Sequence, residues 1–146
     1  MTTASAHRRP AVSDEADALA RIREEGGRVT AAKRSVVELV FASEQARTAD
    51  EFADALDGVD RSVIYRALAQ LEELGIVEHV HLGHGSAVYR RRGLATVPVA
   101  CLVCGEAVEI DRDLTDRLRA EVEAETGIAL DLVHFPLTGR CRRCRS

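Results

Sequence analysis

One stretch of this 146-residue chain decides the fold of its first half, and it reads Asp60-Arg-Ser-Val-Ile-Tyr-Arg-Ala-Leu-Ala-Gln-Leu-Glu-Glu-Leu-Gly75. Asp60 is a favourable helix N-cap residue, and Gly75 is the residue type that commonly follows the last helical turn. Apolar residues recur at spacings of four and three: Ile64, Leu68, Leu71 and Leu74. The opposite face carries Arg61, Ser62, Tyr65 and Arg66. This pattern predicts an amphipathic helix with one face in a core and a polar face near its N-terminus.

Three shorter helices are expected before this one. Ser13 is the expected cap of the first helix, which ends at Gly26-Gly27, and Thr30 is the expected cap of the second. The third helix opens with Thr48-Ala-Asp-Glu51, a capping-box pattern. Each of the three has apolar residues at helical spacing, so all three can pack against the apolar stripe of the fourth.

A β-hairpin is expected directly after the fourth helix. Residues 76–82 are rich in branched side chains, Gly83-His84-Gly85 supplies a turn, and residues 86–90 resume an extended pattern. Three helices, a fourth helix with a polar face, and a hairpin predict a winged helix-turn-helix domain over residues 13–90. Residues 1–12 have no apolar period and are expected to form a disordered arm.

The second half predicts a small α/β unit over residues 95–146, joined to the first domain by a linker at residues 91–94. A helix is expected from about Asp113 to Thr126, followed by a strand with one apolar face over residues 128–134. The apolar stretch that opens the unit contains Pro98, which places it at a sheet edge or bulge. The overall fold class is therefore α+β. A unit of about fifty residues buries little surface, so it needs a metal, a partner subunit or both.

Two cysteine pairs, Cys101-Leu-Val-Cys104 and Cys141-Arg-Arg-Cys144, bracket most of this unit. Each Cys-x-x-Cys knuckle aims two thiolates at one ion, and two knuckles complete a tetrahedron, which predicts a closed structural zinc site. Structural disulfides are disfavoured in a reducing compartment. Redox-active dithiols, four independent core cysteines and an iron–sulfur cluster are the alternatives.

Composition narrows the function further. Lys and Arg total 20 against 24 Asp and Glu, so any nucleic-acid site must be a local patch. Aromatic residues make up only 3% of the chain, which argues against stacking platforms for single strands or RNA bases. No apolar run is long enough for a membrane span, and residues 1–11 do not resemble a signal peptide. The expected location is the cytoplasm, with no membrane partner.

The polar face of the fourth helix is the candidate DNA-reading surface, because a recognition helix places its first turns in the major groove. The expected contacts are base edges for Arg61 or Ser62, a thymine methyl or phosphate for Tyr65, and a phosphate for Arg66. Further basic residues would contact the DNA backbone or a minor groove: Arg28, Lys33, Arg34, Arg8 and Arg9. The alternative is an ordinary solvated face, since acidic residues lie on the same helix.

Taken together, these motifs resemble the ferric uptake regulator (Fur) family over residues 14–146. The matching segments are Gly27-Arg-Val-Thr30 with Lys33, Ser62-Val-Ile-Tyr-Arg-Ala-Leu68, Leu71-Glu-Glu-Leu-Gly-Ile-Val77, Ala87-Val-Tyr89, Cys101-Leu-Val-Cys-Gly105 and Gly139-Arg-Cys-Arg-Arg-Cys144. The resemblance implies a winged-helix DNA-binding domain followed by a dimerisation domain with one structural Zn²⁺ per chain. It also implies a homodimeric repressor that binds an inverted-repeat operator in double-stranded DNA.

The chain departs from the family at the usual sensory metal site. Members carry histidines five and three residues before the first knuckle, where this chain has Thr96 and Pro98. The family's ligand just after the wing aromatic falls at Arg90, a permanent cation. The family's histidine before the third cysteine falls at Val133, with His134 one residue away and on the opposite face of a regular strand. The resemblance therefore implies a divergent member whose sensory site is dismantled.

Two replacements for that site follow as hypotheses. Metal sensing could have moved to a secondary set of candidate ligands: His79, His81, His84, Glu109 and His134. Arg90 could instead form an interdomain ion pair with Glu109 or another carboxylate. Such a pair would hold the two domains together by charge, in place of the metal ion that other family members bind there.

The leading interpretation is a homodimeric transcription regulator of Fur type, with structural zinc and with DNA binding that is independent of a sensed metal. One alternative restores a metal or redox response, through a relocated site or through the four cysteines. Another alternative is a zinc-dependent protein-interaction module without DNA binding. An enzyme is not expected, because the sequence has no phosphate-cradling glycine loop, Ser-His-Asp order or open-sided metal site.

Overall fold

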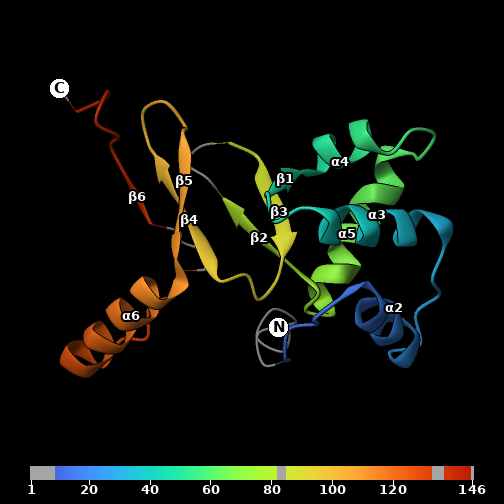
Figure 1. Ribbon diagram of the computed structural model, residues 1–146, viewed down its shortest axis with the longest axis horizontal. Coiled ribbons are helices and arrows are strands. Elements are labelled where there is room, and N and C mark those ends of the chain that lie inside the picture. The colour runs from blue at the N-terminus through green and yellow to red at the C-terminus, as the bar shows by residue number, and fades with distance from the viewer. Residues whose placement is uncertain (1–8, 82–84, 133–136, 146) are drawn as a thin grey trace. The chain divides into compact units, whose positions relative to one another are not determined.

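The computed structural model in Figure 1 describes residues 9–81, 85–132 and 137–145. The chain forms two compact units. The first comprises the residues up to His79 together with Val88–Gly93, and the second comprises Val80–Ala87 together with the residues from Leu94 onward. Helices dominate the first unit, and the second combines a small sheet with one helix. The predicted α+β class is confirmed.

The helices of the first unit are α2 (Glu15–Glu24), α3 (Ala31–Ala42), α4 (Ala49–Ala55) and α5 (Arg61–Glu73). Three predicted caps are confirmed, because Thr30, Thr48 and Asp60 accept hydrogen bonds from first-turn backbone amides. The prediction for the first helix was wrong by one residue. Asp14 caps α2, while the Ser13 hydroxyl donates to an acidic side chain of that helix. Within the described ranges, no helix is long and apolar enough to cross a membrane.

The apolar stripe of α5 lies in the core of the first unit. Ile64, Leu68 and Leu71 are at most 1% exposed, as their spacing predicts. They belong to one cluster with buried residues of the other three helices, among them Leu19, Ile22, Val36, Val37, Val40 and Phe52. Because this face of α5 is fixed in the core, the opposite face, with Tyr65 and Arg66, is exposed to solvent.

A three-stranded sheet in the order β1-β3-β2 accompanies the helices: β1 (Arg47–Thr48), β2 (Val77–His81) and β3 (Ala87–Arg91). β2 and β3 are the strands of the predicted hairpin. β1 was not predicted, because two residues are too few to show an alternating pattern. It pairs antiparallel with β3, with Arg47 opposite Tyr89. β3 extends through Arg91, one residue into the segment predicted as linker.

The second unit contains a sheet in the order β5-β4-β6 and one helix: β4 (Thr96–Cys101), β5 (Ala107–Asp111), α6 (Arg112–Thr126) and β6 (Thr138–Gly139). β4 pairs antiparallel with β5, where Val99 lies opposite Val108. Pro98 lies in β4, the central strand of this order, although its own position is a local edge of the described sheet. The parallel pairing with β6 involves only Ala100 and Cys101 of β4. At Pro98 the described sheet has a neighbour on one side only, which tolerates the missing backbone N–H.

The strand predicted over residues 128–134 was wrong where the structure describes it. Residues 128–132 form no strand, and Ile128 is 62% exposed. Gly127, with φ of 72°, ends α6 in the left-handed conformation. The Thr126 hydroxyl then accepts the backbone N–H of Ile128 at 3.1 Å, so this backbone group is used in a local turn instead of a ladder. His134 lies outside the described residues.

The capping box of α4 allows a direct test of how much the predicted N-cap residue Thr48 contributes to stability. The Thr48 hydroxyl accepts the Glu51 backbone N–H at 3.1 Å, and the Glu51 carboxylate accepts the Thr48 N–H at 2.7 Å. We expect Thr48→Ala to lower the free energy of unfolding by about 1 kcal/mol, because a first-turn amide loses its acceptor. Thr48→Ser keeps that oxygen and should stay close to wild type. Urea unfolding followed by circular dichroism measures both, and equal losses would contradict the cap assignment.

Candidate metal centre and nucleic-acid interface

The four cysteines of the second unit come together at one point. All four sulfur atoms lie within 4.8 Å of one another, and the Sγ atoms of Cys104 and Cys141 are 3.8 Å apart. Four sulfurs bound at about 2.3 Å to one tetrahedral ion would be separated by about 3.8 Å. The donor set therefore fits one structural zinc ion with no position left for a substrate.

Backbone hydrogen bonds shape the two knuckles around this point. In the first, Gly105 donates its N–H to the Cys101 carbonyl at 3.0 Å, with the positive φ of 76° that a glycine tolerates. In the second, Cys144 donates to the Cys141 carbonyl at 3.0 Å. The backbone N–H of Cys141 also points at the Cys101 sulfur, 3.4 Å away. These hydrogen bonds hold both knuckles in the turn that directs their sulfur atoms to one point.

The electrostatics of the cluster favour thiolates at part of the site. Backbone amides, those of Cys104 and Cys141 foremost, lower the pKa of Cys101 to about 6. A hydrogen bond from Cys144 lowers the pKa of Cys141, and the same contact raises the pKa of Cys144 to about 12. Arg143 pairs with Glu106 at 2.7 Å and also contacts Cys141, so both groups raise the pKa of its guanidinium. This arginine offsets part of the negative charge that four thiolates would gather around zinc.

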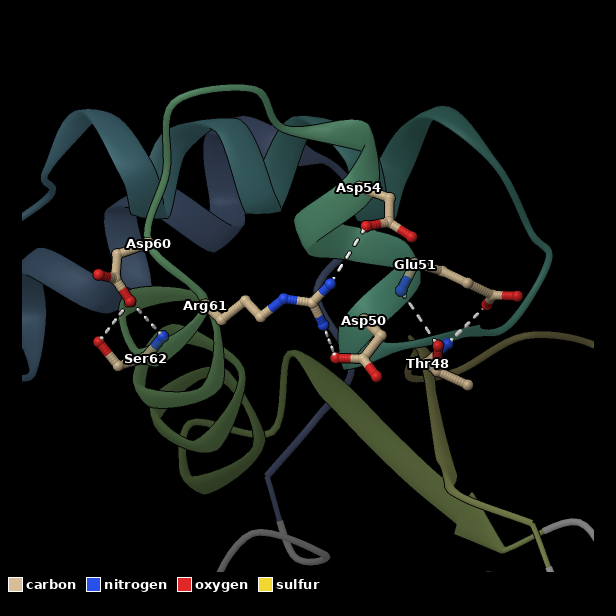
Figure 2. A network of polar contacts seen from close by, with 7 residues as sticks. All are labelled: Thr48, Asp50, Glu51, Asp54, Asp60, Arg61 and Ser62. Atoms are coloured by element: carbon tan, nitrogen blue, oxygen red, sulfur yellow. Dashed lines mark hydrogen bonds and ion pairs between the residues drawn. The ribbon is translucent and has the colours of Figure 1, made fainter.

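In the first unit, polar side chains at the N-terminal end of α5 bind other groups of the protein itself, as Figure 2 shows. Arg61 forms ion pairs with Asp50 and Asp54 of α4, the latter at 3.4 Å. The Ser62 backbone N–H and hydroxyl both donate to the Asp60 carboxylate at 2.9 Å, and these bonds lower the pKa of Asp60. Both residues expected to read base edges are therefore engaged with carboxylates of the protein itself.

The next turn of α5 presents the predicted pair Tyr65 and Arg66. Tyr65 is 50% exposed, and Arg66 is exposed with its Nε donating to the Ser62 carbonyl at 3.2 Å. Arg66 also lines a cavity of about 320 Å³ together with Lys33 and the α3 cap Thr30. Lys33 donates to the carbonyl of the exposed Arg28 at 2.9 Å. Of the predicted DNA-contacting residues, Lys33 and Arg66 therefore line one cavity, Arg28 contacts Lys33 from the segment before α3, and Tyr65 is the exposed neighbour of Arg66 on α5.

Arg90, at the position of a family metal ligand, is buried with only 3% of its surface exposed. Its Nε and Nη2 both lie 3.0 Å from Glu78 Oε1, on the adjacent strand β2 of the same unit. Glu78 was not singled out from the sequence, although hairpin pairing places β2 and β3 side by side and could have suggested it. The interdomain pair expected for Arg90 stays a prediction.

The histidines proposed as relocated ligands do not form a cluster in the described part of the chain. The imidazole of His79 contacts the Glu72 carboxylate of α5, and its ring lies 6.1 Å from that of Tyr89. His81 and Glu109 are exposed, and they belong to the second unit. His84, like His134, lies outside the described residues. Among the residues described, only the four cysteines gather three or more metal-binding side chains.

Comparison with known proteins identifies the family. The model of the ferric uptake regulator family matches residues 24–137, well over half of the chain. The chain belongs to the ferric uptake regulator family. A ferric uptake regulation protein of Neisseria meningitidis is 28% identical over 134 residues, which cover 88% of this chain and 93% of that protein. A zinc uptake regulation protein of Mycobacterium tuberculosis is 28% identical over 127 residues, which cover 83% of this chain and 97% of that protein.

Solved structures of the Fur family share the fold. The ferric uptake regulator Fur of Helicobacter pylori superposes with a TM-score of 0.71 at 18% identity, covering 94% of this chain and 98% of that one. The Vibrio cholerae ferric uptake regulator superposes with a TM-score of 0.67 at 24% identity, and the match covers 84% of this chain and 98% of that one. The resemblance drawn from the sequence motifs is therefore confirmed. Fur-family proteins are DNA-binding transcription regulators, and this chain carries the cysteine cluster of a structural zinc site.

The zinc site of this Fur-family chain is tested by replacing one ligand. We expect the wild type to hold about one zinc ion per chain. Cys104→Ser should retain far less zinc, because a serine hydroxyl is a poor zinc ligand. Val103→Ser, in the same turn, keeps all four thiols and should retain the ion. Zinc is quantified by mass spectrometry of the protein after gel filtration. Full zinc retention in Cys104→Ser would remove this cysteine from the ligand set.

The buried pair of Arg90 and Glu78 predicts strong coupling in stability. We expect Arg90→Met to lower the free energy of unfolding by about 3 kcal/mol, because it leaves the Glu78 carboxylate without this cation. Adding Glu78→Gln should recover a large part of the loss, since the uncompensated charge is then gone. Denaturant unfolding of both single variants and the double variant measures the coupling. Additive losses would mean that the two side chains do not stabilise each other.

Proposed function

We propose that this Fur-family chain is a homodimeric repressor in the cytoplasm that binds an inverted-repeat operator without requiring a sensed metal. In this proposal residues 13–90 bind DNA, residues 91–94 link the domains, and residues 95–146 form the dimerisation domain around one structural zinc ion. The family's usual sensory site is replaced by residues that do not bind metals.

The observation that carries the proposal is the buried pair of Arg90 and Glu78. A guanidinium has only N–H donors and stays protonated, so it cannot ligate a metal ion. Arg90 occupies the ligand position after the wing aromatic, and its charge is balanced by Glu78 at 3.0 Å. Thr96 and Pro98 stand where the family carries histidines. A fixed cation with a fixed counter-charge at this position favours a conformation that no longer depends on metal loading.

DNA binding is supported by the exposed face of α5. Tyr65 and Arg66 project from a helix whose other face is locked in the core, which is the geometry a recognition helix needs. Lys33 and Arg66 line one cavity beside the N-terminus of α3, where a DNA phosphate would be favoured. Ser62 and Arg61, held by carboxylates, would have to exchange partners to reach DNA.

Dimerisation is supported by the apolar surface of the second unit. Leu114 and Leu118 of α6 are 52% and 38% exposed, and Val108 of β5 is 56% exposed. β5 is also an edge strand of its described sheet. An exposed edge and exposed large apolar side chains require a cover, and a second copy supplies one by two-fold symmetry. Two-fold symmetry would place two α5 helices on one side of the duplex, which accounts for an inverted-repeat operator.

The test is DNA affinity as a function of metal. Protein verified to hold its structural zinc is titrated with an inverted-repeat duplex selected from a random pool, with added zinc, iron or manganese, or with a mild chelator. We expect the dissociation constant to stay within about twofold in all conditions, because the charges at the former sensory position are fixed. Wild-type protein stripped of structural zinc is the control and should lose binding.

Two other results of this titration would each favour one of the alternative functions. A clear metal dependence would mean that sensing has moved, and the histidines at 79, 81, 84 and 134 would be the first to replace. Absence of binding to any selected duplex by a folded, zinc-loaded dimer would favour a protein-interaction module.

A further inference from the structure

Arg61 is the first residue of α5, and its guanidinium is turned toward α4 (Figure 2). Its Nη1 donates to Asp50, and its Nη2 lies 3.4 Å from Asp54 Oδ1. The two aspartates are four residues apart, so they lie one turn from each other on the same side of α4. The two terminal nitrogens of the guanidinium are thus each matched with a separate carboxylate.

These two nitrogens are the ones an arginine uses to bind DNA. The terminal fork of a guanidinium pairs with O6 and N7 of guanine or with two oxygens of a phosphate. A carboxylate oxygen is an acceptor of the same kind, with a negative charge like that of phosphate. Asp50, Asp54 and a DNA site therefore compete for the same donors of Arg61.

The two aspartates lie in different electrostatic positions on α4, because Asp50 is in the first turn, where the helix dipole favours a carboxylate. The capping box at the start of α4 is completed by Thr48 and Glu51. Asp54 lies in the last turn of the helix, where the helix dipole disfavours a carboxylate. A cation beside it, in this case Arg61, removes that disadvantage. The network around Asp60 is separate, because Asp60 caps α5 through Ser62.

We propose that Asp50 and Asp54 set the DNA affinity of this protein by competing with DNA for Arg61. The inference rests on the proposed DNA binding and adds to it two affinity-determining residues on α4 that need not touch DNA themselves. The Arg61 side chain is 56% exposed and its partners are 59% and 73% exposed, so solvent screens both ion pairs. DNA can therefore displace them, at a moderate cost in affinity.

The experiment compares charge-neutral variants in two backgrounds. Fluorescence anisotropy measures the affinity of the full-length, zinc-loaded protein for a duplex selected from a random pool by the wild type. Asp50→Asn with Asp54→Asn removes both competing carboxylates. Glu38→Gln with Asp57→Asn is the matched control, which removes two exposed carboxylates outside the contacts of Arg61. Both double variants are also made in an Arg61→Gln background, and thermal unfolding verifies that all variants are folded.

We expect the Asp50 and Asp54 double variant to bind about three- to tenfold more tightly than the control variant. In the Arg61→Gln background that advantage should vanish, because the contested side chain is gone. An equal advantage in both backgrounds would overturn the inference, since it would reflect general repulsion between carboxylates and phosphates. No advantage, or weaker binding, would also overturn it and would mean that the aspartates orient Arg61 productively. If the wild type selects no duplex, the proposed function itself fails, whereas the preceding outcomes leave it standing.

Discussion

Burial of the apolar stripe of α5 is the constraint on which the first unit depends. Ile64, Leu68 and Leu71 are almost completely removed from solvent, and each contributes about 1.5 to 3 kcal/mol relative to an exposed side chain. Rotating α5 by half a turn would expose all three, so the helix has one allowed orientation. That orientation fixes which residues face outward, and it places Arg61 against α4 while Tyr65 and Arg66 project to solvent. The candidate DNA surface is therefore a consequence of core packing and not of local charge.

The second unit depends on a different constraint, because its sheet buries little. In β4 the buried apolar residues are Val97, Ala100 and Cys101, with Pro98 also buried. A zinc ion held by Cys101, Cys104, Cys141 and Cys144 would join the end of β4 to the C-terminal segment, because Cys101 and Cys141 are 40 positions apart. Ligand binding then replaces the missing core, since the free energy of zinc binding becomes free energy of folding. The exposed apolar residues of α6 and β5 are the surface that the proposed dimer would cover.

Features encoded by neighbouring residues could be predicted from the sequence, among them the caps at Thr30, Thr48 and Asp60 and the α5 stripe. The cysteine cluster could be predicted across 37 positions because two Cys-x-x-Cys pairs complete the four ligands of one zinc ion. Other tertiary contacts could not be predicted. The strand predicted after residue 127 failed because alternation specifies a face but not a pairing partner, and Thr126 offered the backbone a local alternative. Arg61 was expected to face DNA because helical spacing shows which side a residue occupies. The sequence alone does not show that α4 brings two carboxylates to that side.

Arginine–carboxylate pairs occur both in the wing, at Arg90, and at the start of α5, at Arg61, and the proposed function gives the two pairs different roles. A sensed metal changes the local charge when it binds or leaves, so it can shift a conformational equilibrium. The buried Arg90, paired with Glu78, cannot act in this way, because a guanidinium has only N–H donors and does not bind a metal ion. The contacts of Arg61 with Asp50 and Asp54 are exposed and weak, so DNA itself can exchange them. Under the proposed function, the pair at Arg90 stabilises the DNA-binding unit, while the exchangeable ion pairs lie at the start of α5. If DNA recruits Arg61 as proposed, its affinity would be set by the intramolecular carboxylates and by salt, because both act directly on this arginine.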